Sequence, residues 1–264
     1  MQLATDKMIA RKENGIGWMI FNNPARRNAV SLAMRQAMVE IFESYQADPD
    51  VRVLIMCGAG DKAFVSGADI SEFKEKRDNA EAAAEYAAVS ARSTSAMEAF
   101  DKPIIAMIRG FCIGGGLATA LGADIRIASD DSQFGIPAAK LGLGYNFDYL
   151  RKLTDVVGPA FASEILFAGR RMDAQRALAM GLINNVVSVA DLESTVLSLA
   201  SEIANNAPLT VKASKETIKQ IRKDEKTRDL ALVEQLIKNC FDSADYKEGR
   251  AAFGEKRTPV FRGQ

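Results

Sequence analysis

Three consecutive glycines, Gly114 to Gly116, form the segment of this sequence best suited to chemistry. The apolar residues 103–108 before them are typical of a buried strand, and the small residues 117–121 after them are typical of a helix. Glycine permits positive φ and leaves its N–H group uncovered, and a helix start adds unpaired donors and a positive dipole end. Such a turn suits an anion, either a phosphate or the negative charge that develops on a thioester oxygen.

The glycines also allow two other interpretations. A tight turn that packs a helix closely against a strand would need them equally. A dinucleotide-binding loop is less compatible, because the spacing of Gly110, Gly114, Gly115 and Gly116 is not G-x-G-x-x-G. The turn alone therefore does not decide which anion, if any, is bound.

The absence of histidine restricts the chemistry more than any other feature of the composition. It excludes Ser-His-Asp and Cys-His catalysis and histidine-ligated metal sites. Cys57, Cys112 and Cys240 are too scattered for a structural zinc site and are typical of reduced thiols in a cytoplasmic protein. We therefore expect no metal, and proton transfer must come from Asp, Glu, Lys, Tyr or water.

The charge balance and the hydrophobic pattern bear on partners. Lys plus Arg and Asp plus Glu each number 34, so the formal net charge is zero and gives no support for a nucleic-acid partner. No apolar run approaches the roughly 20 residues that span a bilayer, and residues 1–7 lack the core of a signal peptide. We expect a cytoplasmic protein with no membrane partner.

Strand and helix patterns alternate along most of the chain. Apolar runs predict buried strands at 16–21, 51–56, 103–108 and 123–128. From residue 191 onward the pattern is nearly all helical, with a break before Pro208. The sequence predicts an α/β core over 1–190 and a helical region over 191–264, which we expect to pack on a neighbouring copy.

Two segments resemble the signatures of the crotonase (enoyl-CoA hydratase/isomerase) superfamily: residues 64–70, and residues 110–117 followed by 122–128. Shorter matches occur at 22–24, 28–29, 133–137 and 177–183, in the order of the family and across nearly the whole chain. The resemblance implies a ClpP-like spiral of ββα units with a C-terminal helical trimerisation region. It also implies a homotrimer or a homohexamer.

The same resemblance implies an acyl-CoA thioester substrate, so coenzyme A would arrive as part of the substrate and no separate cofactor is needed. It places an oxyanion hole, which stabilises a thioester enolate, at the backbone N–H groups of Ala68 and Gly115. The positions that correspond to coenzyme A contacts are Arg26, Arg27, Ala29, Ser66, Ala68, Asp69, Ile70, Gly114, Lys256 and Phe261. Lys256 and Phe261 would act at a subunit contact, and each arginine could equally be a solvated surface charge.

Two departures from the family bear on the reaction. Hydratases of the family use two glutamates as acid and base, and the corresponding positions here are Ala118 and Ala138. The isomerases rely on the second of these carboxylates. Because alanine cannot transfer a proton, the two-glutamate hydratase mechanism is disfavoured.

Residues 143–148 resemble the matching segment of methylmalonyl-CoA decarboxylases, which carry a tyrosine at the position of Tyr145. Those enzymes differ in having a histidine at the position of Ala68 and a glutamate at that of Ala118. Loss of CO₂ produces a thioester enolate directly, so decarboxylation needs no base, and a neutral hydroxyl can orient the departing carboxylate. Tyr145 could equally be a packing residue at the rim of the pocket.

A lyase reaction such as decarboxylation is therefore our leading hypothesis. Hydration by a relocated acid or base is the first alternative, with Asp148 as the candidate, although Asp148 also suits a charge at a helix N-terminus. A non-catalytic acyl-CoA-binding subunit is the second. We interpret one cationic run as a solvated helix face, namely Lys212, Lys215, Lys219, Arg222, Lys223 and Lys226.

Overall fold

The computed structural model describes residues 1, 3–69 and 80–264, and Ile70 of the predicted coenzyme A contacts lies outside them. Six strands form the larger sheet, in the spatial order β1-β2-β3-β5-β7-β10. They are β1 (Met8–Glu13), β2 (Ile16–Phe21), β3 (Val53–Gly58), β5 (Ile104–Ile108), β7 (Ile125–Ser129) and β10 (Asn185–Val187). β1 runs antiparallel to β2, and all the other neighbours in this sheet are parallel.

A smaller sheet has the order β4-β6-β8-β9. Its strands are β4 (Ala63–Val65), β6 (Phe111–Ile113), β8 (Gln133–Gly135) and β9 (Met172–Asp173). The chain passes repeatedly from the larger sheet into the smaller one, from β3 to β4, from β5 to β6 and from β7 to β8, and a helix follows each pair. The two sheets and the intervening helices therefore wind as a spiral of ββα units, and the α/β prediction is confirmed.

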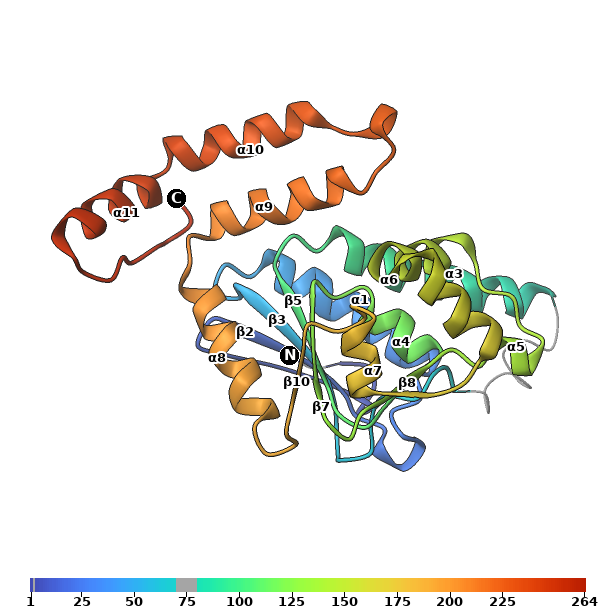
Figure 1. Ribbon diagram of the computed structural model, residues 1–264. Coiled ribbons are helices and arrows are strands. Elements are labelled where there is room, and N and C mark those ends of the chain that lie inside the picture. The colour runs from blue at the N-terminus through green and yellow to red at the C-terminus, as the bar shows by residue number, and fades with distance from the viewer. Residues whose placement is uncertain (2, 70–79) are drawn as a thin grey trace.

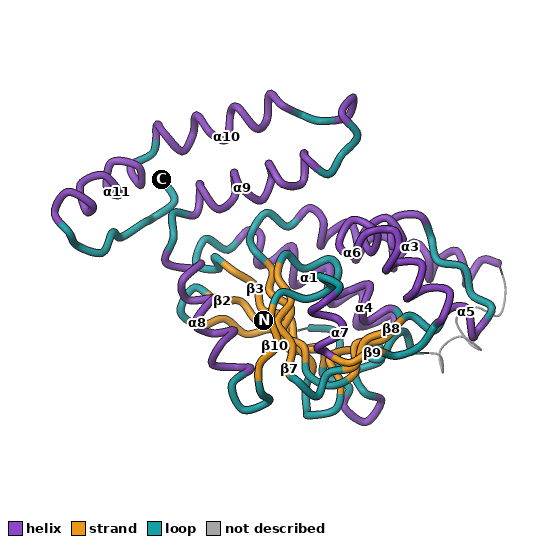
Figure 2. The backbone as a smooth tube through the Cα atoms, in the orientation of Figure 1, coloured by secondary structure: helices purple, strands orange, loops and turns teal. Residues whose placement is uncertain are grey.

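The helices of the body cover both faces of the larger sheet. They are α1 (Leu32–Ala47), α3 (Ala80–Ala99), α4 (Gly115–Ala120), α5 (Ala138–Leu141), α6 (Phe147–Ala168), α7 (Ala174–Ala179) and α8 (Leu192–Asn205). Figure 2 shows the strands gathered in the centre, with α1, α3, α4 and α6 on one side and α8 on the other. α6 is interrupted at Gly158, whose φ of 74° and ψ of 163° leave the helical region ahead of Pro159.

The sequence of the central strands explains the two cores. Alternate residues of β3 point to opposite faces, so Leu54 and Met56 pack in the core beneath α1, while Val53 and Ile55 pack against α8. Both faces are buried, which is why the central strands are continuously apolar rather than alternating. Ser31 caps the N-terminus of α1, and its Oγ accepts a hydrogen bond of 3.3 Å from the N–H of Met34.

The C-terminal helices divide into two groups. α8 packs on the larger sheet through Leu192, Val196, Ala200 and Ala204, so it belongs to the body although it lies beyond residue 190. The remaining helices form an arm: α9 (Pro208–Ile221) is bonded to the body through Lys212, Lys215 and Lys219, and α10 (Leu230–Asp242) and α11 (Ala244–Glu255) lie farther out, as Figure 1 shows. The predicted division of the chain at residue 190, into a core and a helical region that packs on a neighbouring copy, stays a prediction. Within the described residues, no helix has the length and apolar character to cross a membrane.

Candidate functional site

The glycine turn lies between β6 and α4 and depends on two close backbone approaches. Gly114 has φ 56° and ψ −117°, a conformation that side-chain-bearing residues rarely adopt. A Cβ placed on Gly116 would lie 2.0 Å from the carbonyl oxygen of Val65, so a side chain is excluded there. The glycines therefore bring the start of α4 directly against the end of β4.

Ala68 reaches the same turn from the other side. Val30 donates to the carbonyl of Gly67 at 2.9 Å, and Asp69 donates to the carbonyl of Val30 at 3.0 Å. In such a parallel bridge, the N–H of Ala68 itself points away from Val30. A Cβ placed on Gly115 would lie 3.6 Å from the nitrogen of Ala68, so the two backbones are adjacent.

Both N–H groups are available as donors. Gly115 is the first residue of α4 and has no acceptor within the helix. In the part of the chain that the structure describes, no hydrogen bond uses the N–H of Ala68. Two adjacent, uncovered N–H donors at a helix start can stabilise a negatively charged oxygen.

Among the described residues, Tyr145 brings a polar side chain to this turn. A Cβ placed on Gly114 would lie 3.4 Å from the hydroxyl oxygen of Tyr145. The ring of Tyr145 is partly buried and packs edge to face on Tyr149, with ring centroids 6.1 Å apart. Burial raises the pKa of Tyr145 above its ordinary value, so the hydroxyl is a neutral hydrogen-bond donor at physiological pH.

Ala118 and Ala138 lie close to the same turn. The N–H of Ala118 donates to the carbonyl of Gly114 at 3.1 Å, one helical turn further along α4. Gly114 in turn donates to the carbonyl of Gly135 at 2.8 Å, three residues before Ala138. Both alanines are buried, 6% and 7% exposed, so they offer only methyl groups to their surroundings.

Asp148 is placed differently. It is exposed in the first turn of α6, whose N-cap is Asn146. There its carboxylate interacts favourably with the positive end of the helix. Among the described residues, no hydrogen bond or ion pair joins Asp148 to Tyr145 or to the glycine turn. The structure thus agrees better with the helix-charge interpretation than with a relocated acid.

Three predicted coenzyme A contacts lie together beside Ala68. Arg26 forms an ion pair of 3.6 Å with the buried Asp69, and its carbonyl accepts a hydrogen bond of 3.3 Å from the Oγ of Ser66. The side chain of Arg27 instead packs on Phe111, with its guanidinium 5.2 Å from the centre of the Phe111 ring. The N–H of Ala29 donates to Arg26, and its carbonyl accepts from the Nδ2 of Asn23, so the backbone of Ala29 is engaged within the loop.

Sequence reasoning assigned no role to Asn28, which organises this loop. Asn28 is fully buried, with a left-handed φ of 55°. Its Nδ2 donates to the carbonyls of Ala59 and Ala63 at 3.0 and 2.7 Å, and its Oδ1 accepts from the N–H of Asn23 at 2.9 Å. The signal in the sequence was the pair of asparagines at 23 and 28 around Pro24, which is typical of a hydrogen-bonded turn.

Lys256 and Phe261 belong to the arm. Lys256 is exposed just after α11, and the carbonyl of Phe261 accepts a hydrogen bond of 2.7 Å from the guanidinium of Arg52. Figure 1 shows α11 at the far end of the molecule from α4. Within one chain, these two residues are therefore not brought to the glycine turn.

Comparison with known proteins decides the family. The family model for enoyl-CoA hydratase/isomerase matches residues 11–264. This protein belongs to that family. A short-chain-enoyl-CoA hydratase from Clostridium acetobutylicum is 34% identical over 252 residues, which are 96% of each chain. A carnitinyl-CoA dehydratase from Proteus mirabilis is 34% identical over 256 residues, which are 93% of this chain and 94% of that one.

Solved structures agree with the assignment to the enoyl-CoA hydratase/isomerase family. An enoyl-CoA hydratase/carnithine racemase from Magnetospirillum magneticum has a TM-score of 0.93 and 38% identity, over 99% of this chain and 97% of that one. The crotonase fold implied by the sequence motifs is thereby confirmed. The family's glycine turn and its partner loop, which lie 47 residues apart at Ala68 and Gly115, are adjacent in space.

Proposed function

We propose that this protein is an enzyme that acts on an acyl-CoA thioester and stabilises a thioester enolate at the N–H groups of Ala68 and Gly115. The observation that carries the proposal is the adjacency of the two backbones, with 3.6 Å between the Gly115 Cβ position and the Ala68 nitrogen. A donor of this kind lowers a reaction barrier by about 2.7–4 kcal/mol. Coenzyme A is then a part of the substrate, and we propose no separate cofactor.

Decarboxylation is the lead reaction. The bond between the α-carbon and the carboxylate breaks, CO₂ leaves, and the bonding electrons move into the thioester as an enolate. Solvent then supplies a proton to the α-carbon. This sequence requires no base, and it suits a site where Ala118 and Ala138 present methyl groups. The neutral hydroxyl of Tyr145, next to Gly114, can donate a hydrogen bond to the carboxylate of the substrate.

Hydration is the second candidate, because relatives of this chain are named enoyl-CoA hydratase and carnitinyl-CoA dehydratase. Adding water to a conjugated thioester needs a group that transfers protons. Asp148 is the carboxylate nearest in sequence to Tyr145, but it lies exposed at the start of α6. Hydration would therefore require Asp148 to reach the turn when substrate is bound.

Coenzyme A would lie along the loop where Arg26, Ser66 and Asp69 meet. The side chain of Arg26 is 57% exposed, and its guanidinium can pair with a phosphate of the nucleotide. Because Lys256 and Phe261 are distant from the turn in one chain, we propose that they contact the nucleotide bound by a neighbouring copy. That arrangement requires the homotrimer or homohexamer that the resemblance implies.

Two substrates separate the candidate reactions. Decarboxylation of methylmalonyl-CoA is measured by the release of CO₂. Hydration of crotonyl-CoA is measured by the loss of absorbance of the conjugated thioester. We expect CO₂ release that falls about tenfold in Tyr145→Phe, which removes one hydrogen bond to the carboxylate. Asp148→Asn is the matched control in the same segment, and we expect it to keep the rate of the unmodified protein.

The other outcomes are equally informative. Crotonyl-CoA hydration that disappears in Asp148→Asn would replace decarboxylation by hydration with a relocated acid. Efficient hydration that survives Asp148→Asn would contradict the argument from the absent glutamates. Tight binding of acyl-CoA thioesters with no turnover of any of them would favour a non-catalytic binding subunit.

A further inference from the structure

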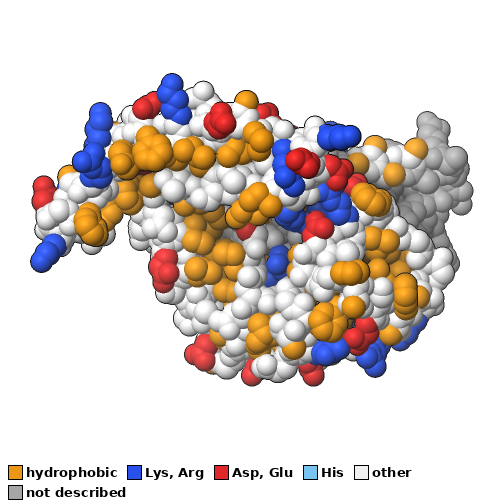
Figure 3. All heavy atoms as spheres, turned by 45° about the horizontal axis from the view of Figure 1, so that its top comes forward, with side chains coloured by type: hydrophobic (Ala, Val, Ile, Leu, Met, Phe, Trp, Pro, Cys, Tyr) orange, Lys and Arg blue, Asp and Glu red, His pale blue; other side chains and the backbone are white. Residues whose placement is uncertain are grey.

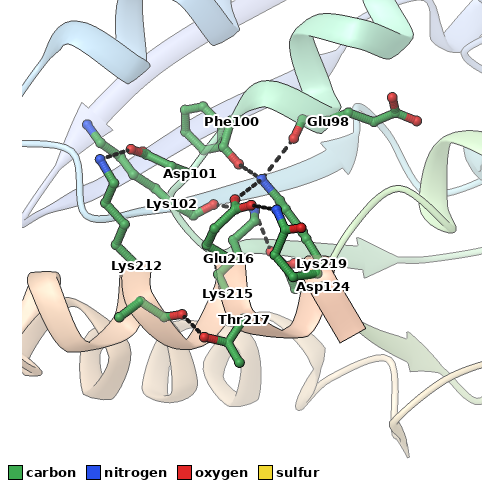
Figure 4. A network of polar contacts seen from close by, with 12 residues as sticks. Glu98, Phe100, Asp101, Lys102, Asp124, Lys212, Lys215, Glu216, Thr217 and Lys219 are labelled. Carbon is green, nitrogen blue, oxygen red and sulfur yellow. Dashed lines mark hydrogen bonds and ion pairs between the residues drawn. The ribbon is translucent and has the colours of Figure 1, made fainter. Parts of the chain in front are cut away.

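The cationic run of residues 212–226 begins on α9 and is mostly exposed, as a solvated face would be, but that interpretation is wrong for Lys215. The Lys215 side chain is only 8% exposed. Its Nζ donates to the carbonyl of Lys102 at 2.7 Å and to Oδ2 of Asp124 at 2.9 Å, and it lies 5.7 Å from the centre of the Phe100 ring (Figure 4). Burial lowers the pKa of Lys215, while the charge of Asp124 raises it.

Asp124 lies in the short segment between the end of α4 and the start of β7. The hydrogen bonds from Leu121 to Leu117 at 2.9 Å and from Ala123 to Ala120 at 3.1 Å continue the helical turn that begins at Gly115. Asp124 follows directly and binds Ile104 twice, through its own N–H at 2.9 Å and through Oδ2 at 2.7 Å. Lys215 therefore pairs with the carboxylate that joins the segment between α4 and β7 to the start of β5.

A second set of contacts joins α9 to α6. The guanidinium of Arg222, just after α9, pairs with Oδ2 of Asp155 at 3.0 Å. The guanidinium of Arg151 donates to the carbonyl of Arg222. Arg151 and Asp155 lie in the half of α6 that precedes the break at Gly158, and that half begins two residues after Tyr145.

We propose that α9 clamps the two helices whose N-termini border the candidate site, and that Lys215 and Arg222 are positioning residues for it. α4 supplies the N–H of Gly115, and α6 begins beside Tyr145. Arg222, the C-cap of α9, holds α6 directly through Asp155, whereas Lys215 acts on α4 through Asp124, four residues beyond the end of that helix. The inference goes beyond the choice of reaction, but it rests on the proposed role of Gly115.

The test separates positioning from stability with acetoacetyl-CoA, a thioester whose enolate absorbs in the near ultraviolet. Its dissociation constant reports binding, and the enolate signal per bound ligand reports how well the N–H groups stabilise the oxyanion. In Lys215→Met and in Arg222→Gln, we expect a nearly unchanged dissociation constant and an enolate signal lower by about tenfold, as for a small displacement of a catalytic group.

Lys212→Met is the matched control, because Lys212 lies on the same helix but pairs with Asp101 with its side chain 46% exposed. We expect it to leave the enolate signal unchanged. The double variant Lys215→Met with Asp124→Asn removes the buried ammonium together with the charge of its 37% exposed partner, so we expect it to regain stability against urea without regaining the enolate signal. This last result would not follow if Lys215 contributed to stability alone.

An enolate signal equal to that of the unmodified protein in folded Lys215→Met and Arg222→Gln would overturn the clamp. If Lys215→Met does not fold, Arg222→Gln decides, because Arg222 is exposed at the surface. If the unmodified protein forms no enolate, the proposed role of Gly115 is wrong. In that case, amide hydrogen exchange tests the clamp. The clamp predicts faster exchange over residues 115–121 in Lys215→Met than in Lys212→Met, and equal rates would refute it.

Discussion

At the scale of single residues, the candidate site depends on backbone groups more than on side chains. The proposed donors are the N–H groups of Ala68, whose side chain is a single methyl group, and of Gly115, which has no side chain. Substituting most other residues for these two would leave the donors in the chain. Only proline removes an N–H, so proline gives the direct test of the role of Gly115.

We predict that Gly115→Pro lowers turnover of the acyl-CoA substrate about 10²–10³-fold, since one oxyanion donor is lost. Proline is well accepted at the first position of a helix, so α4 should still form. The measurement is kcat together with the dissociation constant of the acyl-CoA, which we expect to change little. Thr119→Val is the control, because it removes only the hydrogen bond of 3.0 Å from Thr119 to the carbonyl of Gly115. Full activity in a folded Gly115→Pro variant would refute the oxyanion role.

At the scale of elements, the site is assembled by close contact between α4 and β4. Gly116 is buried, and the carbonyl of Val65 occupies the space that its Cβ would need. This contact sets how near the start of α4 comes to the loop that carries Ala68. The third glycine of the turn is therefore required for packing, whereas the second is proposed to act on the substrate.

We predict that Gly116→Ala lowers the free energy of unfolding by about 1–3 kcal/mol, as is typical of overpacking. The built Cβ lies 2.0 Å from a backbone oxygen, which cannot move aside as a flexible side chain can. Urea unfolding at one fixed protein concentration measures the change. Gly254→Ala in α11 is the control, because its Cβ meets open space, and we expect it to be stabilised by about 0.5–1 kcal/mol. Equal stabilities of the two variants would contradict the packing argument.

The sequence predicted long, periodic elements better than short ones. The apolar run at 16–21 is β2, and the helical pattern from residue 191 onward contains α8, α9, α10 and α11. β4 and β6 have three residues each, too few to show a period, and they form because they pair with each other. The partners of Lys215 were equally hidden, since Asp124 lies 91 residues away along the chain and only folding brings the two together.

At the scale of the whole molecule, the arm leaves an apolar surface uncovered. Within the described chain, α10 has no buried residue, and Leu230, Ile237 and Phe241 are 61%, 46% and 58% exposed. Their spacing of seven and four residues places them on one face of the helix. Figure 3 shows hydrophobic side chains in a row along the arm. Such a surface favours association between copies, as the proposed homotrimer or homohexamer requires.

We predict that Leu230→Glu combined with Ile237→Glu lowers the mass measured by light scattering from that of a trimer or hexamer toward that of a monomer. Each substitution removes about 1.5–3 kcal/mol of favourable free energy that burial of the apolar side chain would contribute per copy. Each new carboxylate would also have to be desolvated at the interface. Lys238→Glu is the control, because Lys238 is exposed but lies off the apolar face. If Lys256 and Phe261 act on a neighbouring copy, the double variant should also bind acyl-CoA more weakly, although its own turn is intact. An unchanged mass in the double variant would show that α10 does not form the subunit contact.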